Sequence, residues 1–259
     1  MTKNIISKLP KKNNWLSWLG AGLTELLFPP GQLCPVCFQE HSLQKGLGQQ
    51  CLNKLMLITE PYCIKCGKPL RLHPQFNQLC KQCETTELFF EKARAVALYE
   101  GALREYLADL KYRFRPELGQ ALGELLVEWV RANPDFRKAD LVIPIPVHPH
   151  KLAARGYNQA ELLAYPLADY LGMVVKNRVL VRTKLTETQN SLNRVDRFLN
   201  VKNAFEIINT SAVSGRRVLL IDDILTTGAT VSEAARLLLK AGATEVNVLT
   251  LATGIIEPD

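Results

Sequence analysis

The cysteines constrain this sequence more than any other residue type. All seven lie in the first third of the chain, at positions 34, 37, 51, 63, 66, 80 and 83. An odd number of cysteines, grouped in pairs two residues apart, makes a poor disulfide framework and a good metal-binding one. Because free thiols and metal thiolates persist in reducing compartments, this usage also predicts a cytoplasmic protein.

The pairs Cys63-x2-Cys66 and Cys80-x2-Cys83 are separated by 13 residues. Each CxxC turn presents two sulfurs to one ion, so two turns complete a tetrahedron around Zn2+. The alternative is four free thiols in a small core, which would leave this segment too few apolar residues to fold. The spacing therefore predicts a structural zinc site at these four cysteines.

Cys34, Cys37 and Cys51 indicate a second, weaker zinc site. By spacing, its fourth ligand would fall at position 54, which is Lys54. His41 is the only nearby substitute, although a single histidine is more often a surface residue. Both zinc ions would be structural, because four protein ligands leave no position for water or substrate.

Composition excludes a disordered chain, since 47% of the 259 residues are hydrophobic and 22% are charged. This length accommodates two domains. The net charge of +7 is spread along the chain, so it permits a nucleic-acid partner without requiring one.

We expect no transmembrane segment, because the apolar stretch at 15–28 has 14 residues and contains Glu25, whereas a span needs about 20 apolar residues. Its helical spacing predicts an amphipathic helix that packs on the protein, binds a partner or lies on a membrane surface.

From Ala93 onward, strand patterns alternate with helix patterns, which predicts an α/β domain with a mainly parallel sheet. Strands are expected at 93–99, 141–147, within 174–181, at 218–221 and at 245–252. Helices are expected near 103–110, 118–129 and 230–241, and at 159–171 with an interruption at Pro166. The apolar run Val218–Ile221 is typical of a strand that is covered on both faces.

Two adjacent carboxylates, Asp222 and Asp223, follow that apolar run and precede a loop of threonine and glycine. Ligands of open parallel sheets bind at the carboxyl ends of the strands. The loop opens the next helix, whose N–H groups and positive dipole end suit a phosphate. The carboxylates suit sugar hydroxyls or a cation; alternatively, they only cap the strand.

Residues 218–230 resemble the PRPP (5-phosphoribosyl 1-pyrophosphate) motif of type I phosphoribosyltransferases. Across about residues 24–255, the chain resembles the ComF/GntX (ComFC-like) family. Besides the cysteines, the segments that carry this resemblance are Leu26-Leu-Phe-Pro, Leu110-Lys111-Tyr112, Ile143-Pro-Ile-Pro-Val-His148, Arg155-Gly-Tyr-Asn158-Gln159-Ala and Gln189-x2-Leu192-x4-Arg197-x2-Asn200 followed by Ala204-Phe205. The departure is Lys54, where the first ribbon of the family often has a cysteine.

The resemblance implies a tail with an amphipathic helix at 1–33, a double zinc ribbon at 34–88 and a phosphoribosyltransferase domain with a Rossmann-like sheet at 89–259. Asp222 and Asp223 would bind the ribose hydroxyls of PRPP and stabilise positive charge near C1′. The 5′-phosphate would bind the loop formed by Thr226, Thr227, Gly228, Ala229 and Thr230.

The resemblance also places Arg155 in the pyrophosphate loop, where a guanidinium can bind two phosphate oxygens. Lys111 could reach a phosphate as well, although both cations could instead be ordinary surface residues. Residues 182–200 resemble the mobile flap of such enzymes, or are an ordinary polar loop. The flap residues that we single out are Gln189, Arg194, Arg197 and Asn200.

The function implied is a Mg2+-dependent phosphoribosyltransferase whose acceptor the sequence does not identify. Members similar to this chain are associated with DNA uptake and natural transformation. The alternative is therefore a non-catalytic protein that senses a nucleotide or handles single-stranded DNA. A third possibility is a scaffold whose ribbon and N-terminal helix bind a protein of the competence machinery.

Overall fold

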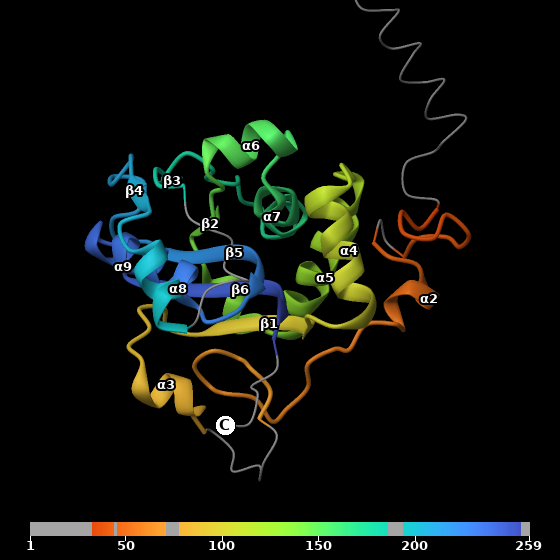
Figure 1. The fold of residues 1–259 in the computed structure, drawn as a ribbon, viewed down its shortest axis with the longest axis horizontal. Coiled ribbons are helices and arrows are strands. Elements are labelled where there is room, and N and C mark those ends of the chain that lie inside the picture. Colours follow the sequence, from red (N-terminus) through yellow and green to blue (C-terminus); the bar gives the residue numbers. More distant parts are fainter. Residues whose placement is uncertain (1–32, 44–45, 71–77, 186–193, 255–259) are drawn as a thin grey trace, which may run out of the picture.

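The computed structural model describes residues 33–43, 46–70, 78–185 and 194–254 (Figure 1). Its main sheet has four parallel strands in the order β1-β6-β5-β2. These strands are β1 (Ala93–Leu98), β2 (Leu141–Pro144), β5 (Arg217–Leu225) and β6 (Glu245–Thr253). The parallel sheet confirms the predicted α/β architecture.

Helices cover both faces of this sheet (Figure 1). Those of the α/β region are α4 (Gly101–Tyr112), α5 (Glu117–Ala132), a 3-10 helix (Pro134–Lys138), α6 (Pro149–Arg155), α7 (Gln159–Tyr170), α8 (Arg194–Val201) and α9 (Ala229–Lys240). Helices α4, α5 and α7 share one core with Leu219 and Ile221 of β5, whereas α9 shares the other with Val218 and Leu220. The apolar run of β5 is therefore buried on both faces, as predicted.

Strand β5 is longer than the sequence indicates, because it continues through Asp222 and Asp223 to Leu225. Strand β6 keeps pairing with it as far as Leu225, whereas the pairing with β2 ends at Ile221. The prolines at the end of β2 have no N–H with which to extend that pairing. The two carboxylates consequently lie inside a strand, at the point where its neighbour leaves the sheet.

Three further features differ from our expectations. Strand β3 (Leu180–Arg182) pairs antiparallel with β4 (Phe205–Ile207) in a separate sheet, and the sequence pattern does not indicate β4. Helix α7 runs without interruption through Pro166, which is buried. Helix α6 occupies much of the loop that follows β2, where we expect irregular structure.

The cysteine region contains α2 (Gln49–Leu52) and α3 (Lys81–Thr85), and it packs on both cores. Cys34 and Cys51 belong to the core beneath α4 and α5, while Cys63 and Cys66 belong to the core beneath α9. Between the two groups, the chain pairs antiparallel with β1 at Leu57↔Ala97. This pairing covers a sheet edge that would otherwise be exposed.

Among the described residues, no helix is both long and apolar enough to span a membrane.

Candidate functional site

Asp222 and Asp223 form the centre of the candidate site. Both are buried, with 9% and 4% of their surface exposed, and the backbone N–H of Asp223 donates to Asp222 Oδ1 at 2.9 Å. Lys111, at the end of α4, forms an ion pair with Asp223. The structure thus brings together the acidic pair and one of the two cations that we singled out from the sequence.

The two carboxyls have different protonation behaviour. Burial and the neighbouring Asp223 raise the pKa of Asp222. Burial also acts to raise the pKa of Asp223, but Lys111 outweighs it and holds that pKa below its usual value. Despite burial, Asp223 raises the pKa of Lys111. Asp223 and Lys111 are therefore both charged at neutral pH, whereas Asp222 takes up a proton more readily.

Gln159 links the acidic pair to the second predicted cation. It lies in the first turn of α7, and its side chain hydrogen-bonds Asp223 and accepts from Arg155 Nη1. Arg155 therefore reaches the site through an amide rather than by direct contact with a carboxylate. We did not single out Gln159 as a site residue from the sequence, although it lies in a segment that carries the family resemblance.

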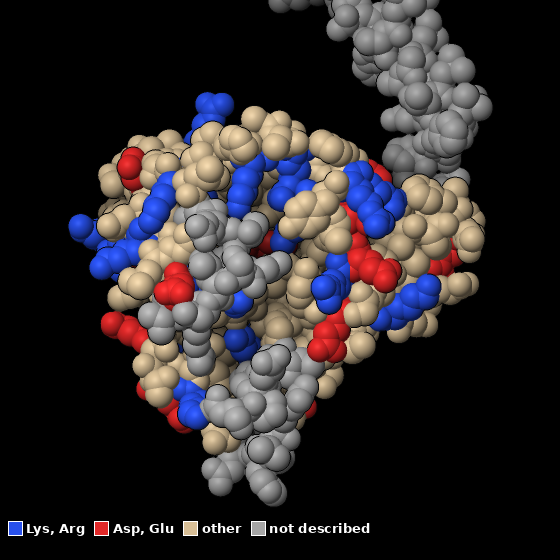
Figure 2. All heavy atoms as spheres, viewed as in Figure 1, with Lys and Arg blue, Asp and Glu red and all other residues tan. Residues whose placement is uncertain are grey.

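Two more cations belong to the site: Lys151 lies near Lys111 and Arg155, and Arg182 interacts with both Lys151 and Asp222. Burial lowers the pKa of Lys151, and the positive charges of Arg182, Arg155 and Lys111 lower it further. Figure 2 shows Lys and Arg side chains gathered in the upper half of this face, over α6 and the neighbouring parts of β3 and α4. A cluster of cations beside two acids suits a ligand that carries several phosphates.

Of the five residues predicted to bind a phosphate, Thr226, Thr227 and Gly228 form the loop after β5, and Ala229 and Thr230 begin α9. Gly228 has φ +79°, a left-handed conformation that glycine adopts readily, and it is the N-cap of α9. The Thr227 hydroxyl accepts a hydrogen bond from the Ala229 N–H at 3.4 Å. Thr226 and Thr230 flank this turn, so the whole loop lies at the N-terminus of a 12-residue helix.

The segment with the second group of cysteines packs directly against this loop. The side-chain amide of Gln82, in α3, donates to the carbonyl oxygen of Thr227, and Gln82 is buried. Phe90 lies 3.6 Å from the position that a Cβ would take on Gly228. Sequence reasoning did not find this contact, because Gln82 and Thr227 are 145 residues apart.

The structure describes the predicted flap only in part. Gln189 lies outside the described residues. Arg194 begins α8, and Arg197 and Asn200 are half-buried residues of the same helix, which packs against α9. This part of the flap is therefore helical, whereas we expected a loop.

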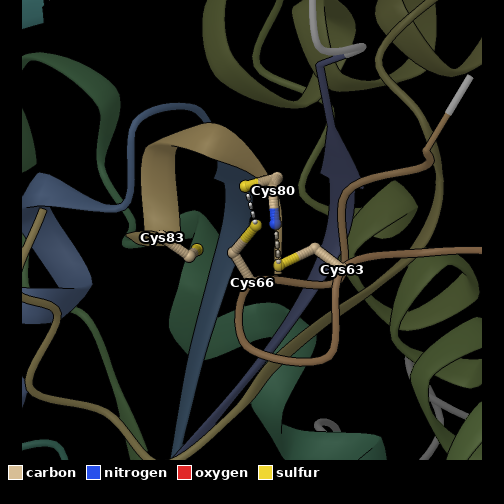
Figure 3. Close-up of side chains that lie close together, drawn as sticks. All are labelled: Cys63, Cys66, Cys80 and Cys83. Carbon is tan, nitrogen blue, oxygen red and sulfur yellow. Dashed lines mark hydrogen bonds between the residues drawn. The ribbon is translucent and has the colours of Figure 1, made fainter. Parts of the chain in front are cut away.

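The four cysteines at 63, 66, 80 and 83 converge (Figure 3). Their sulfurs all lie within 4.8 Å of one another, and the Sγ atoms of Cys66 and Cys80 are 3.7 Å apart. Four sulfurs bound to zinc at about 2.3 Å are separated by about 3.8 Å in a tetrahedron. The geometry fits a structural zinc ion.

The other cluster contains Cys34, Cys37 and Cys51, as predicted, but its fourth member is Glu40. His41, the alternative ligand, is not a member of this cluster: its side chain is exposed, and the carboxylate of Glu40 lies beside the sulfurs. Hydrogen bonds from the backbone N–H groups of Gln50 and Cys51 lower the pKa of Glu40.

Comparisons with known proteins agree with this arrangement. The family model described as "Phosphoribosyl transferase domain" matches residues 115–258, and the one described as "Double zinc ribbon domain" matches residues 23–84. The chain is 32% identical to Competence protein F of Haemophilus influenzae, over 82% of this chain and 92% of that protein. It is 33% identical to the DNA utilization protein YhgH of Salmonella typhimurium, over 86% of this chain and 97% of that protein. It is 32% identical to Competence protein ComFC of Bacillus subtilis, over 78% of this chain and 81% of that protein. The chain therefore belongs to the ComF family, in which a double zinc ribbon precedes a phosphoribosyltransferase domain.

Proposed function

We propose that the protein binds PRPP at the end of β5 and transfers its phosphoribosyl group to an acceptor. The observation that carries this proposal is the succession of Asp222, Asp223 and the loop at the start of α9, with a cation cluster beside them. A sugar that carries a phosphate at one end and a pyrophosphate at the other matches this order of groups.

In this function, Asp222 and Asp223 accept hydrogen bonds from the ribose 2′- and 3′-hydroxyls. Their negative charge stabilises the positive charge that develops at C1′ as the bond to pyrophosphate breaks. The loop N–H groups and threonine hydroxyls bind the 5′-phosphate. Lys111 and Arg155 neutralise the pyrophosphate as it leaves, and the ion pair between Lys111 and Asp223 must loosen for the lysine to do so.

Mg2+ would be bound mainly by oxygens of the substrate, since this ion retains several non-protein ligands in phosphate sites. It would spread the charge of the leaving pyrophosphate. Asp222 and Asp223 would help to orient the ribose to which such an ion is bound.

The test is calorimetric titration of the zinc-loaded protein with PRPP, with and without Mg2+. We expect micromolar binding that depends on Mg2+ and is lost in Asp222→Asn/Asp223→Asn. The matched control is Asp140→Asn, because Asp140 pairs with Arg217 at the other end of β5 and should not affect binding. Failure of the folded wild-type protein to bind PRPP would contradict the proposal.

A second candidate function, binding of single-stranded DNA, is favoured by one surface feature. Tyr112 and Phe114 are each 69% exposed, and they line a hollow of about 290 Å3 together with Lys111, Lys151 and Arg155. Arg155 also lies over the Tyr112 ring, 5.8 Å from its centroid. Aromatic rings beside cations are what single-stranded nucleic acids bind, through base stacking and phosphate contacts.

Competition separates the two candidates. Both use Lys111 and Arg155, so PRPP should displace a fluorescent oligothymidylate if DNA binds in the hollow. Tyr112→Ala/Phe114→Ala should weaken DNA binding while leaving PRPP affinity nearly unchanged. DNA binding that survives both PRPP and this double substitution would place the DNA elsewhere on the protein.

A further inference from the structure

The first cysteine cluster contains a carboxylate where a fourth thiolate would be expected. One ligand atom each from Cys34, Cys37, Cys51 and Glu40 lies within 4.8 Å of all the others. Glu40 Oε1 is 3.8 Å from Cys37 Sγ. With Zn–S at about 2.3 Å and Zn–O at about 2.1 Å, a tetrahedral site separates sulfur and oxygen by about 3.6 Å. The carboxylate oxygen therefore lies close to the fourth corner of a zinc tetrahedron.

The backbone of the first knuckle brings this carboxylate to the cluster. The Cys34 N–H donates to the Glu40 carbonyl at 2.7 Å, which closes the turn that begins at Cys34. Phe38 lies inside this turn in the left-handed conformation, with φ 55°. The chain reverses its direction in this turn, which places Glu40, three residues after Cys37, beside the cysteine sulfurs.

Helix α2 then fixes the orientation of the carboxylate. The backbone N–H groups of Gln50 and Cys51 donate to Glu40 Oε2 and Oε1, at 3.0 and 3.1 Å. Gly48 leaves the necessary space, because a Cβ at that position would lie 2.2 Å from Glu40 Cδ. Carboxylates that bind metals are normally held by such outer hydrogen bonds. Lys54, the position that spacing indicated for a ligand, is exposed instead.

We propose that the first ribbon binds zinc through the thiolates of Cys34, Cys37 and Cys51 and the carboxylate of Glu40. Three thiolates and one carboxylate carry the same charge as four thiolates, so the ion is equally well neutralised. The competing role for Glu40 is to accept hydrogen bonds from the start of α2 without touching a metal. Glutamine retains only one of these two hydrogen bonds, because its amide has a single accepting oxygen, and it cannot supply the negative charge of a ligand.

The first experiment measures bound zinc in the full chain after dialysis against a graded chelator. Wild type should retain two zinc ions, and Glu40→Gln should retain one. Loss of an outer-shell partner costs about 10- to 100-fold in metal affinity, so loss of a ligand should cost at least that much. His41→Ala is the matched control and should retain both ions. Retention of both ions by Glu40→Gln with wild-type affinity, loss of one by His41→Ala, or a single zinc in wild type would overturn the proposal.

A second measurement does not require a destabilised variant. X-ray absorption of the zinc-loaded wild type should give an average of 3.5 sulfur ligands per zinc, since the seven cysteines share two ions. Glu40→Cys should keep both ions and raise that average to 4. In the cobalt-substituted protein, the same variant should intensify the thiolate charge-transfer band. If Glu40→Cys changes neither the sulfur average nor the cobalt spectrum, the position does not ligate the metal.

Discussion

Replacing Lys111 by methionine should destabilise the protein through the charge that it leaves behind. The side chains of Lys111 and Asp223 are 17% and 6% exposed, so the substitution strands a buried carboxylate beside Asp222. Removing one partner of a buried ion pair costs about 3–5 kcal/mol, and the partial exposure of Lys111 favours the lower end. At about 2–4 °C per kcal/mol for a chain of this size, the midpoint of thermal unfolding should fall by about 6–12 °C.

The loss of stability in Lys111→Met should be larger at high pH than at low pH. Without Lys111, the pKa of Asp223 rises above its unfolded value, so the penalty is greatest at high pH and shrinks as acid protonates the carboxyl. Thermal unfolding of zinc-saturated protein at pH 8 and pH 5.5, followed by circular dichroism, measures both effects. Asp223→Asn should restore most of the stability in the Lys111→Met background. Lys151→Met is the matched control, because neighbouring cations already disfavour the charge of Lys151. A fall of less than about 1 kcal/mol at pH 8, or an unchanged fall in the Asp223→Asn background, would refute this reasoning.

Two further predictions concern contacts on either side of the site. Arg217 holds the pKa of Asp140 at about 2, below its unfolded value, so the stabilisation is present above about pH 4 and is lost as pH falls toward 2. In Asp140→Asn, the free energy of unfolding should therefore depend less on pH in that window. The difference should be at most about 1 kcal/mol, because the pair is partly exposed, and a series of denaturation midpoints measured against pH checks this. Gln82→Leu removes the donor to the Thr227 carbonyl and should weaken PRPP binding about fivefold, the effect of about 1 kcal/mol, without changing zinc content. Titration calorimetry with PRPP, together with metal analysis, tests this second prediction. An unchanged PRPP affinity would show that the contact from Gln82 does not position the loop after β5.

The parallel sheet and the four-cysteine site could be predicted from the sequence because both leave local patterns. An apolar run such as Val218–Ile221 indicates a doubly covered strand, and paired CxxC turns indicate zinc. The bounds of β5 could not be predicted, since two acidic residues are unfavourable in an isolated strand. In the folded protein, the pairing of β5 with β6 and the ion pair between Lys111 and Asp223 stabilise the two acidic residues within the strand.

The contacts that distant residues make left no local pattern to find, although Gln159 lies in a segment that carries the family resemblance. Gln159 reaches Asp223, and Gln82 reaches Thr227, only after the chain has folded. Glu40 was missed for a different reason, because we looked for the usual nitrogen or sulfur ligands at zinc-finger spacing. The sequence shows only that Glu40 lies three residues after Cys37, whereas the space that Gly48 leaves for its carboxylate exists only in the folded chain.

The packing of the ribbon on the loop between β5 and α9 also sets a sequence of events during synthesis. Gln82 leaves the ribosome 145 residues before Thr227, and at about 5–20 residues per second this interval lasts about 7–30 s. During that time the surface that will pack on β5 and α9 has no partner, although its cysteines can already bind metal. Zinc bound to the nascent chain would therefore protect the thiols and stabilise the two CxxC turns at 63–66 and 80–83 until the rest of the protein has been synthesised and packs on them.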